Sequence, residues 1–95
     1  MKNKTLEEIT VFCSEKAPHW KYNEGKIQRK FTFPSFEAAL DFVNAIAILA
    51  EKHHHHPEIL IQFNEVVLQL STHDSDGITQ KDFDLIKEID TLRKN

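Results

Sequence analysis

Four consecutive histidines, His53 to His56, are the clearest candidates for chemistry in this 95-residue sequence. Imidazole gains and loses protons near neutral pH, so histidines suit acid and base catalysis as well as metal binding. Pro57 follows the run and disfavours helical geometry at His56. The histidines are therefore expected where a helix ends and a strand begins. Neighbouring side chains diverge at such an elbow, so at most two of the four are expected to enter one cleft.

The histidine run has two other interpretations. His53 and His56 are three residues apart and could hold a metal ion, but the spacing matches no standard zinc signature and Cys13 is remote in sequence. A solvated polar helix end would also account for the run. These alternatives remain open at this point.

Three further polar residues could act with the histidines. Glu51 continues an apolar helical stripe, so its carboxylate is expected to point inward, where a histidine would offset its unfavourable place at a helix C-terminus. The alternative is a carboxylate that bends out to solvent. His73 is expected to close a strand and reach a cleft at the sheet edge. Asp82 follows Thr79 at the acceptor spacing of a capping box, so helix capping alone would explain it.

The elements that must position these residues follow from hydrophobic spacing and turn residues. Helices are predicted over residues 5–16, from a Ser35 cap to about residue 52, and from a Thr79 cap onward. Two hairpins are predicted, one with strands at 20–22 and 27–33 and one with strands at 59–63 and 66–72. The order α-β-β-α-β-β-α predicts one α+β domain over residues 1–95, with helices packed on one face of a four-stranded, mostly antiparallel sheet.

The predicted second helix is apolar over more than the usual part of its circumference. One stripe consists of Phe36, Leu40, Val43, Ala47 and Ala50, and a second of Ala38, Phe42, Ala45 and Leu49. A sheet can cover one of these faces, and the same helix of another subunit can cover the other. The alternative is packing by the first and third helices. The pattern therefore predicts a homodimer or homotetramer.

Composition excludes several classes of function. The chain has 12 Lys and Arg against 15 Asp and Glu, a net charge of −3, which argues against direct nucleic-acid binding. Its longest apolar-rich stretch, residues 38–50, is interrupted by Asp41 and Asn44 and is too short to cross a bilayer. One cysteine forms no internal disulfide, and no apolar secretion signal opens the sequence. A soluble, cytoplasmic protein without a membrane partner is expected.

Short motifs that span the chain resemble those of a known family. They are Glu51-x-x-x-His55-His56-Pro57, Phe63-Asn64-x-Val66, Ser71-Thr72-His73-Asp74, Gly77-Ile78-Thr79 and Asp82, with Trp20 and Arg29-x-Phe31-x-Phe33-x-x-Phe36 upstream. Together they are similar to the pterin-4a-carbinolamine dehydratase family, whose fold has the element order predicted above. This chain departs from many members at His54 and Ile59, where they carry a small polar or acidic residue and an aromatic residue.

The resemblance implies an activity. The family removes water from 4a-hydroxytetrahydropterin to give quinonoid dihydropterin in tetrahydrobiopterin recycling, and it needs no metal or redox cofactor. By resemblance, His55 and His73 are the acid and base, Glu51 orients a histidine, and His56 holds the pterin. The weaker candidates for lining or supporting the pocket are Trp20, Pro57 and Asp82.

The resemblance also implies an alternative without catalysis. Family members act as binding modules that stabilise a homeodomain transcription factor dimer or assist enzyme assembly. The doubly apolar helix would then contact the protein partner. The complete set of histidines and Glu51 favours the enzyme, because a pure binding module has no need of it.

Overall fold

A computed structural model describes residues 2–93 of the chain. Its elements are α1 (Leu6–Glu15), β1 (Lys21–Asn23), β2 (Lys26–Thr32), α2 (Phe36–His53), β3 (Glu58–Gln62), β4 (Glu65–Leu70), the 3₁₀ turn η1 (His73–Ser75) and α3 (Gln80–Arg93). This confirms the predicted order of helices and strands. Met1, Lys94 and Asn95, which the single-domain prediction includes, lie outside the described residues.

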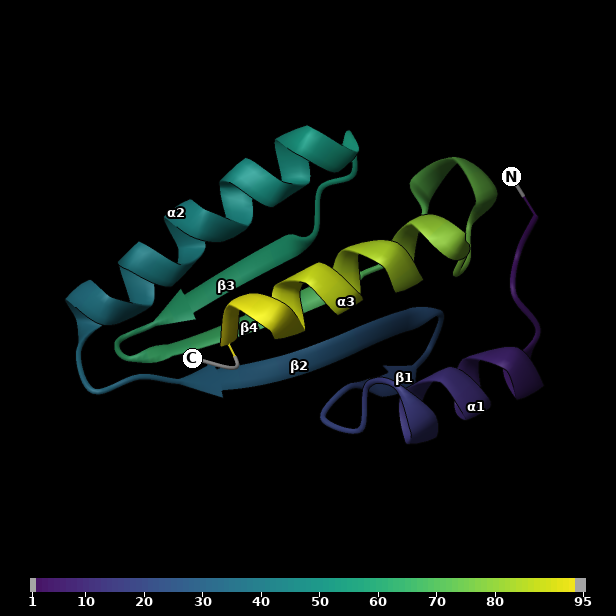
Figure 1. The fold of residues 1–95 in the computed structure, drawn as a ribbon, viewed down its shortest axis with the longest axis horizontal. Coiled ribbons are helices and arrows are strands. Elements are labelled where there is room, and N and C mark those ends of the chain that lie inside the picture. The colour runs from purple at the N-terminus through teal and green to yellow at the C-terminus, as the bar shows by residue number, and fades with distance from the viewer. Residues whose placement is uncertain (1, 94–95) are drawn as a thin grey trace.

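The four strands form one antiparallel sheet in the order β1-β2-β4-β3. All three helices lie on one face of it: α3 crosses β2 and β4, α2 runs along the β3 side, and α1 lies by β1 (Figure 1). The predicted alternation holds, because Ile27 and Phe31 of β2 and Val66, Leu68 and Leu70 of β4 are all buried. The α+β fold class is confirmed.

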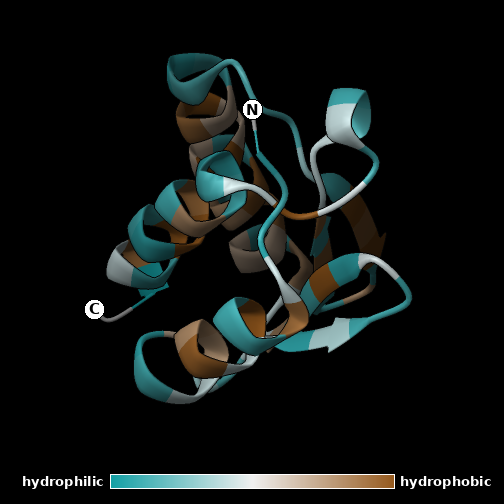
Figure 2. Ribbon diagram, turned by 90° about the vertical axis from the view of Figure 1, so that its right-hand side faces the viewer, coloured by the Kyte–Doolittle hydropathy of each residue, from teal (hydrophilic) through white to brown (hydrophobic). Residues whose placement is uncertain are grey.

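Aromatic side chains fill much of the space between the sheet and the helices. Phe42 of α2 lies 4.7 Å from Phe31 and 5.0 Å from Phe33, measured between ring centroids. Along the helices, polar and apolar stretches alternate, as expected of helices with one buried side (Figure 2). This packing holds α2, which carries the start of the histidine run at its C-terminal end, against the sheet.

The buried side of α2 differs from both predicted stripes. It consists of Ala39, Phe42, Ile46 and Ala50. Ala50 and Phe42 each belong to one predicted stripe, and Ala39 and Ile46 lie between the stripes on the helix surface. Helix α3 contacts α2, as one alternative expected, yet Phe36, Leu40 and the 71% exposed Ile48 remain uncovered in the single chain. The exact stripes were wrong, whereas the prediction of a second, uncovered apolar side holds. No helix within residues 2–93 is long and apolar enough to cross a membrane.

Several strand ends differ from the prediction. β3 ends at Gln62, because Phe63 takes left-handed backbone geometry (φ 54°) in the turn. Asn64 supports this turn by donating from Nδ2 to the Phe33 carbonyl. β4 ends at Leu70, so His73 begins the turn η1 and does not close the strand. This turn projects the His73 side chain from a loop.

Candidate active site

The histidine run forms the predicted elbow between α2 and β3. Helix α2 ends at His53, and His54 takes left-handed geometry (φ 50°) while its N–H donates to the Ala50 and Glu51 carbonyls. The four side chains then diverge. His53 donates from Nε2 to Glu88 Oε2 on α3 at 2.5 Å, and the hydrogen bond with His53 is the main cause that holds the pKa of Glu88 below its ordinary value.

A cleft of about 250 Å³ lies between this elbow and η1. Its lining residues are His54, His55, His56, Ser71, Thr72, His73, Asp74 and Lys81. The structure therefore brings His55, His56 and His73 together, as the motif suggested. The expectation that at most two residues of the run enter one cleft was wrong, because the left-handed His54 turns the backbone and three of them line it.

Asp82 connects this cleft to the first turn of α3. Its carboxylate is fully buried, and Oδ1 lies 2.6 Å from His55 Nε2. Oδ2 accepts a hydrogen bond from the Thr79 N–H at 2.9 Å and another from the Thr72 hydroxyl at 2.8 Å. The capping role that the sequence offered for Asp82 is therefore present, and the same carboxylate also holds a histidine.

These bonds determine where the protons lie. An ionised carboxylate only accepts, so Thr72 donates its hydroxyl proton to Asp82 and must accept from the Thr79 hydroxyl, 2.6 Å away. By the same reasoning, His55 carries a proton on Nε2. Within residues 2–93, every fully buried side-chain nitrogen or oxygen has a hydrogen-bond partner. Nδ1 of His55 has no such partner, so this atom is accessible to solvent. In the neutral ring it presents a lone pair to the cleft.

Glu51 points to solvent, which is the second of the two orientations considered. Its side chain is 77% exposed, and its Oε2 accepts from Nε2 of the exposed His56 at 2.5 Å. The hydrogen bond to His56 lowers the pKa of Glu51, and the positive field of His56 adds to this. The inward orientation was wrong because position 51 lies on the uncovered side of α2. Neither Glu51 nor Pro57 lines the cleft, so Glu51 touches it only through His56.

Trp20 is not brought to the histidines. Its side chain is buried in the core, edge-on to Phe31, and its Nε1 donates to Asp90 Oδ1 at 2.8 Å. It does not line the cleft between the elbow and η1. In this structure Trp20 joins α3 to the sheet.

Comparison with known proteins identifies the family. A sequence model described as "Pterin 4 alpha carbinolamine dehydratase" matches residues 2–92. The chain belongs to the pterin-4-alpha-carbinolamine dehydratase family. A relative from Picosynechococcus sp., named "Putative pterin-4-alpha-carbinolamine dehydratase", is 49% identical over 75 residues, which cover 79% of this chain and 82% of the relative.

Two solved structures resemble this dehydratase-family chain. The transcriptional coactivator/pterin dehydratase from Brucella melitensis superposes with a TM-score of 0.89 at 28% identity, over 96% of this chain and 98% of that one. A pterin dehydratase-like protein described as a RuBisCO assembly factor in the alpha-carboxysome gives a TM-score of 0.65 at 21% identity, over 77% of this chain and 87% of that one. The second likeness concerns the fold alone.

Sequence reasoning gave no individual role to several residues of this pterin dehydratase-family site, namely Ser71, Thr72, Asp74 and Lys81. Thr72 links Asp82 to Thr79, and Lys81 brings a cation to the cleft wall. Both stand next to residues that were singled out, His73 and Asp82, and that adjacency was the available signal. Within residues 2–93, no group of three or more His, Cys, Asp or Glu side chains is arranged to hold a metal ion.

Proposed function

We propose that the chain is a 4a-hydroxytetrahydropterin dehydratase that forms quinonoid dihydropterin in tetrahydrobiopterin recycling. One observation carries the proposal: His55 and His73 line the same cleft, and His55 is fixed by the buried carboxylate of Asp82. Membership of the family supports the choice of a pterin carbinolamine as substrate.

The elimination requires two proton transfers at one substrate. The C4a–O bond breaks as the leaving hydroxyl takes up a proton, and a ring nitrogen loses a proton as the new C=N bond forms. We assign the base to His55, because Asp82 holds its Nε2–H and leaves the Nδ1 lone pair facing the cleft. His73, exposed on η1, is then the acid that protonates the leaving hydroxyl. Water is released, and the scheme draws on no metal ion or redox cofactor.

His56 has a binding role in this scheme. Its ring lines the cleft, and its Nε2 is held by the exposed Glu51 carboxylate. A neutral imidazole oriented in this way can accept a hydrogen bond from the pterin ring at Nδ1 or stack on it. Glu51 is thus a positioning residue for His56.

The test is the decay of enzymatically generated 4a-hydroxytetrahydropterin, followed by ultraviolet absorbance. The wild type is expected to accelerate it, and His55→Ala and His73→Ala are each expected to lose about 10²- to 10⁴-fold of the enzymatic rate. His19→Ala is the matched control, because His19 is exposed and does not line the cleft. A folded wild type that leaves the decay unchanged would contradict the proposal.

A second candidate function rests on exposed apolar surface. Phe36, Leu40 and Ile48 of α2 are exposed in the single chain, and so are Leu60 and Phe63 in the β3 hairpin, although Leu60 pairs with Val67 on the sheet face that points away from the helices. Large apolar side chains exposed together on one helix favour a protein contact at that helix. We assign it to a second copy of the chain, as a homodimer or homotetramer. The alternative is a binding module whose protein partner takes that surface, which would leave the isolated chain monomeric and without dehydratase activity.

A further inference from the structure

A second cleft lies between the end of α1, strand β2 and the C-terminal half of α3. Its volume is about 510 Å³, in the size range of small-molecule sites. The residues that line it are Lys16, Pro18, His19, Arg29, Lys87, Asp90, Thr91 and Arg93. None of them lines the histidine cleft, so it is a separate site.

The lining of this basic cleft is strongly positive. It holds four cationic side chains, Lys16, Arg29, Lys87 and Arg93, against one carboxylate, Asp90. The surplus of three positive charges stands out in a chain whose net charge is −3. Concentration of one sign of charge in a concave surface raises the local concentration of the opposite ion.

The single carboxylate is already committed. Asp90 Oδ1 accepts from Arg29 Nη1 at 2.8 Å and from Trp20 Nε1 at 2.8 Å. The Arg29–Asp90 pair is mostly buried, and the guanidinium also lies 4.3 Å from the centre of the Phe31 ring. Asp90 therefore neutralises Arg29 and fixes its position, and it makes no ion pair with the other three cations.

Those other cations have few partners of their own. Lys16 makes no hydrogen bond or ion pair through its side chain within residues 2–93, and the Lys87 ammonium has only a 3.9 Å approach to Asp84. Arg93 donates from Nη2 to the Thr32 carbonyl, a neutral group, at 2.9 Å. Donors that converge on one cleft without an anion of their own can bind an external one, and phosphate accepts such charged hydrogen bonds well.

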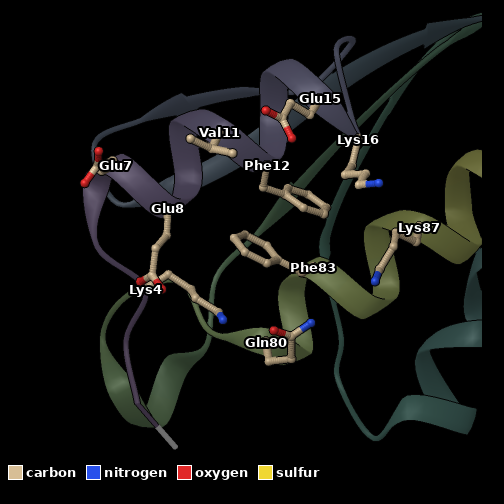
Figure 3. Close-up of a pocket in the computed structure, with 10 residues that line it drawn as sticks. All are labelled: Lys4, Glu7, Glu8, Val11, Phe12, Glu15, Lys16, Gln80, Phe83 and Lys87. Carbon is tan, nitrogen blue, oxygen red and sulfur yellow. The ribbon is translucent and has the colours of Figure 1, made fainter.

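A neighbouring hollow of about 650 Å³ shares Lys16 and Lys87 with the basic cleft (Figure 3). The rings of Phe12 and Phe83, which line this hollow, stack face to face with their centroids 3.9 Å apart. Val11 adds apolar surface to the lining. Three carboxylates also line it, Glu7, Glu8 and Glu15, and they disfavour an anion there. An anionic group therefore belongs in the basic cleft, and an uncharged part of the same ligand fits the hollow.

We propose that the basic cleft binds the phosphate group of a small organic phosphate. Lys16, Lys87 and Arg93 supply positive charge, of which only Lys87 has an ion pair, a long and exposed one with Asp84. Arg29, held by Asp90, forms the fixed wall of the site. This site is independent of the proposed dehydratase chemistry, because it uses none of the same residues.

The test is an amide NMR titration of the full chain at low ionic strength, with inorganic pyrophosphate and with ADP in separate arms. Both are expected to shift amides at Lys16, His19, Lys87 and Thr91, and binding should weaken as salt is added. ADP alone should also shift Val11 and Phe83 if the organic part enters the hollow. Equal binding of both compounds would mean that the phosphates alone are recognised.

Lys16→Gln and Lys87→Gln are the informative variants. Each is expected to weaken binding about 3- to 10-fold, since each removes one charged donor that is partly screened by solvent. Lys21→Gln is the control: it removes the same charge from an exposed lysine outside the cleft. Equal losses in all three variants, shifts confined to the histidine cleft, or no shifts at all would overturn the proposal. Dehydratase activity should be unchanged in all three variants, so the two proposals fail separately.

Discussion

Asp82 Oδ1 and His55 Nε2 lie 2.6 Å apart, although the two residues are separated by 27 positions in the sequence. The contact joins the first turn of α3 to the elbow after α2. Because Asp82 is fully buried and also accepts from Thr72 and Thr79, it cannot turn away from the histidine without losing those bonds. The carboxylate therefore sets which nitrogen of His55 faces the cleft.

Asp82→Asn is expected to reverse the His55 tautomer. Thr72 and Thr79 would keep the amide oxygen on their side, so the amide NH₂ would face His55 and its Nε2 would have to accept. The proton would then move to Nδ1 and remove the lone pair that we assign to the base. We expect a rate loss of about 10- to 100-fold, a part of the value of a general base.

Two measurements separate this positioning role from a merely structural one. Nitrogen NMR of the histidine rings should report the tautomer change in Asp82→Asn, and the pH–rate profile should change shape. Asp84→Asn, on the same helix but bonded to Gln80 and Lys87, serves as control. An unchanged tautomer in a slow variant would contradict the positioning role.

Glu51→Gln is expected to weaken substrate binding more than turnover, because Glu51 touches the cleft only through His56. The expected result is a several-fold higher KM with a kcat within about twofold of the wild type. The hydrogen bond from His56 lowers the pKa of Glu51, so this carboxylate is ionised at neutral pH. Glu51→Gln should therefore leave the acidic limb of the pH–rate profile at the same pH as in the wild type. A shift of that limb would indicate that Glu51 itself transfers a proton. Glu37→Gln, at the other end of α2, is the control.

Glu88 should make folding stability depend on pH. The hydrogen bond from His53 lowers the pKa of Glu88 in the folded state, with a further contribution from Lys52. The ionised carboxylate therefore stabilises the fold above its ordinary pKa of 4.5. This stabilisation is lost as the pH falls through the pKa of the folded state. Glu88→Gln is expected to reduce the free energy of unfolding by up to about 1 kcal/mol at pH 7, since the pair is partly exposed. Urea unfolding at several pH values should show this difference shrink in acid. Asp41→Asn, an exposed change on α2, should show no such trend, and a difference for Glu88→Gln that grows in acid would refute the assignment.

Ile48→Glu is expected to break the proposed oligomer without unfolding the chain. Ile48 is 71% exposed on α2, so the single chain loses almost no packing, whereas two facing copies would each bury a charge without a partner. Light scattering after size exclusion should give a dimer or tetramer for the wild type and a smaller species for the variant. Leu6→Glu, at a 64% exposed position on α1, should behave as wild type. A wild type that is already monomeric would favour the binding-module alternative.

Some features of this protein could be predicted from the sequence because their causes are local. The box in which Thr5 and Glu8 cap α1 closes over three residues, and both of its hydrogen bonds are present. The alternation in β2 and β4 follows from the geometry of a strand, and the histidine elbow follows from the proline after it. Short motifs indicated the family, and with it the set of His55, His56 and His73.

Other features were decided only by tertiary packing. The rotation of α2 about its axis depends on how Phe42 and Ile46 fit against the sheet and α3, and the rotation found places Glu51 on the outward side. The hydrogen bond between Asp82 and His55 depends on elements that are distant in sequence and meet in the fold. The same is true of the position of Trp20, which lies in the core beside Asp90. Interactions within four residues are fixed by backbone geometry, whereas contacts between distant segments depend on how complete helices and strands pack. The arrangement of the cleft residues, and with it the chemistry of the cleft, therefore depends on contacts between distant segments.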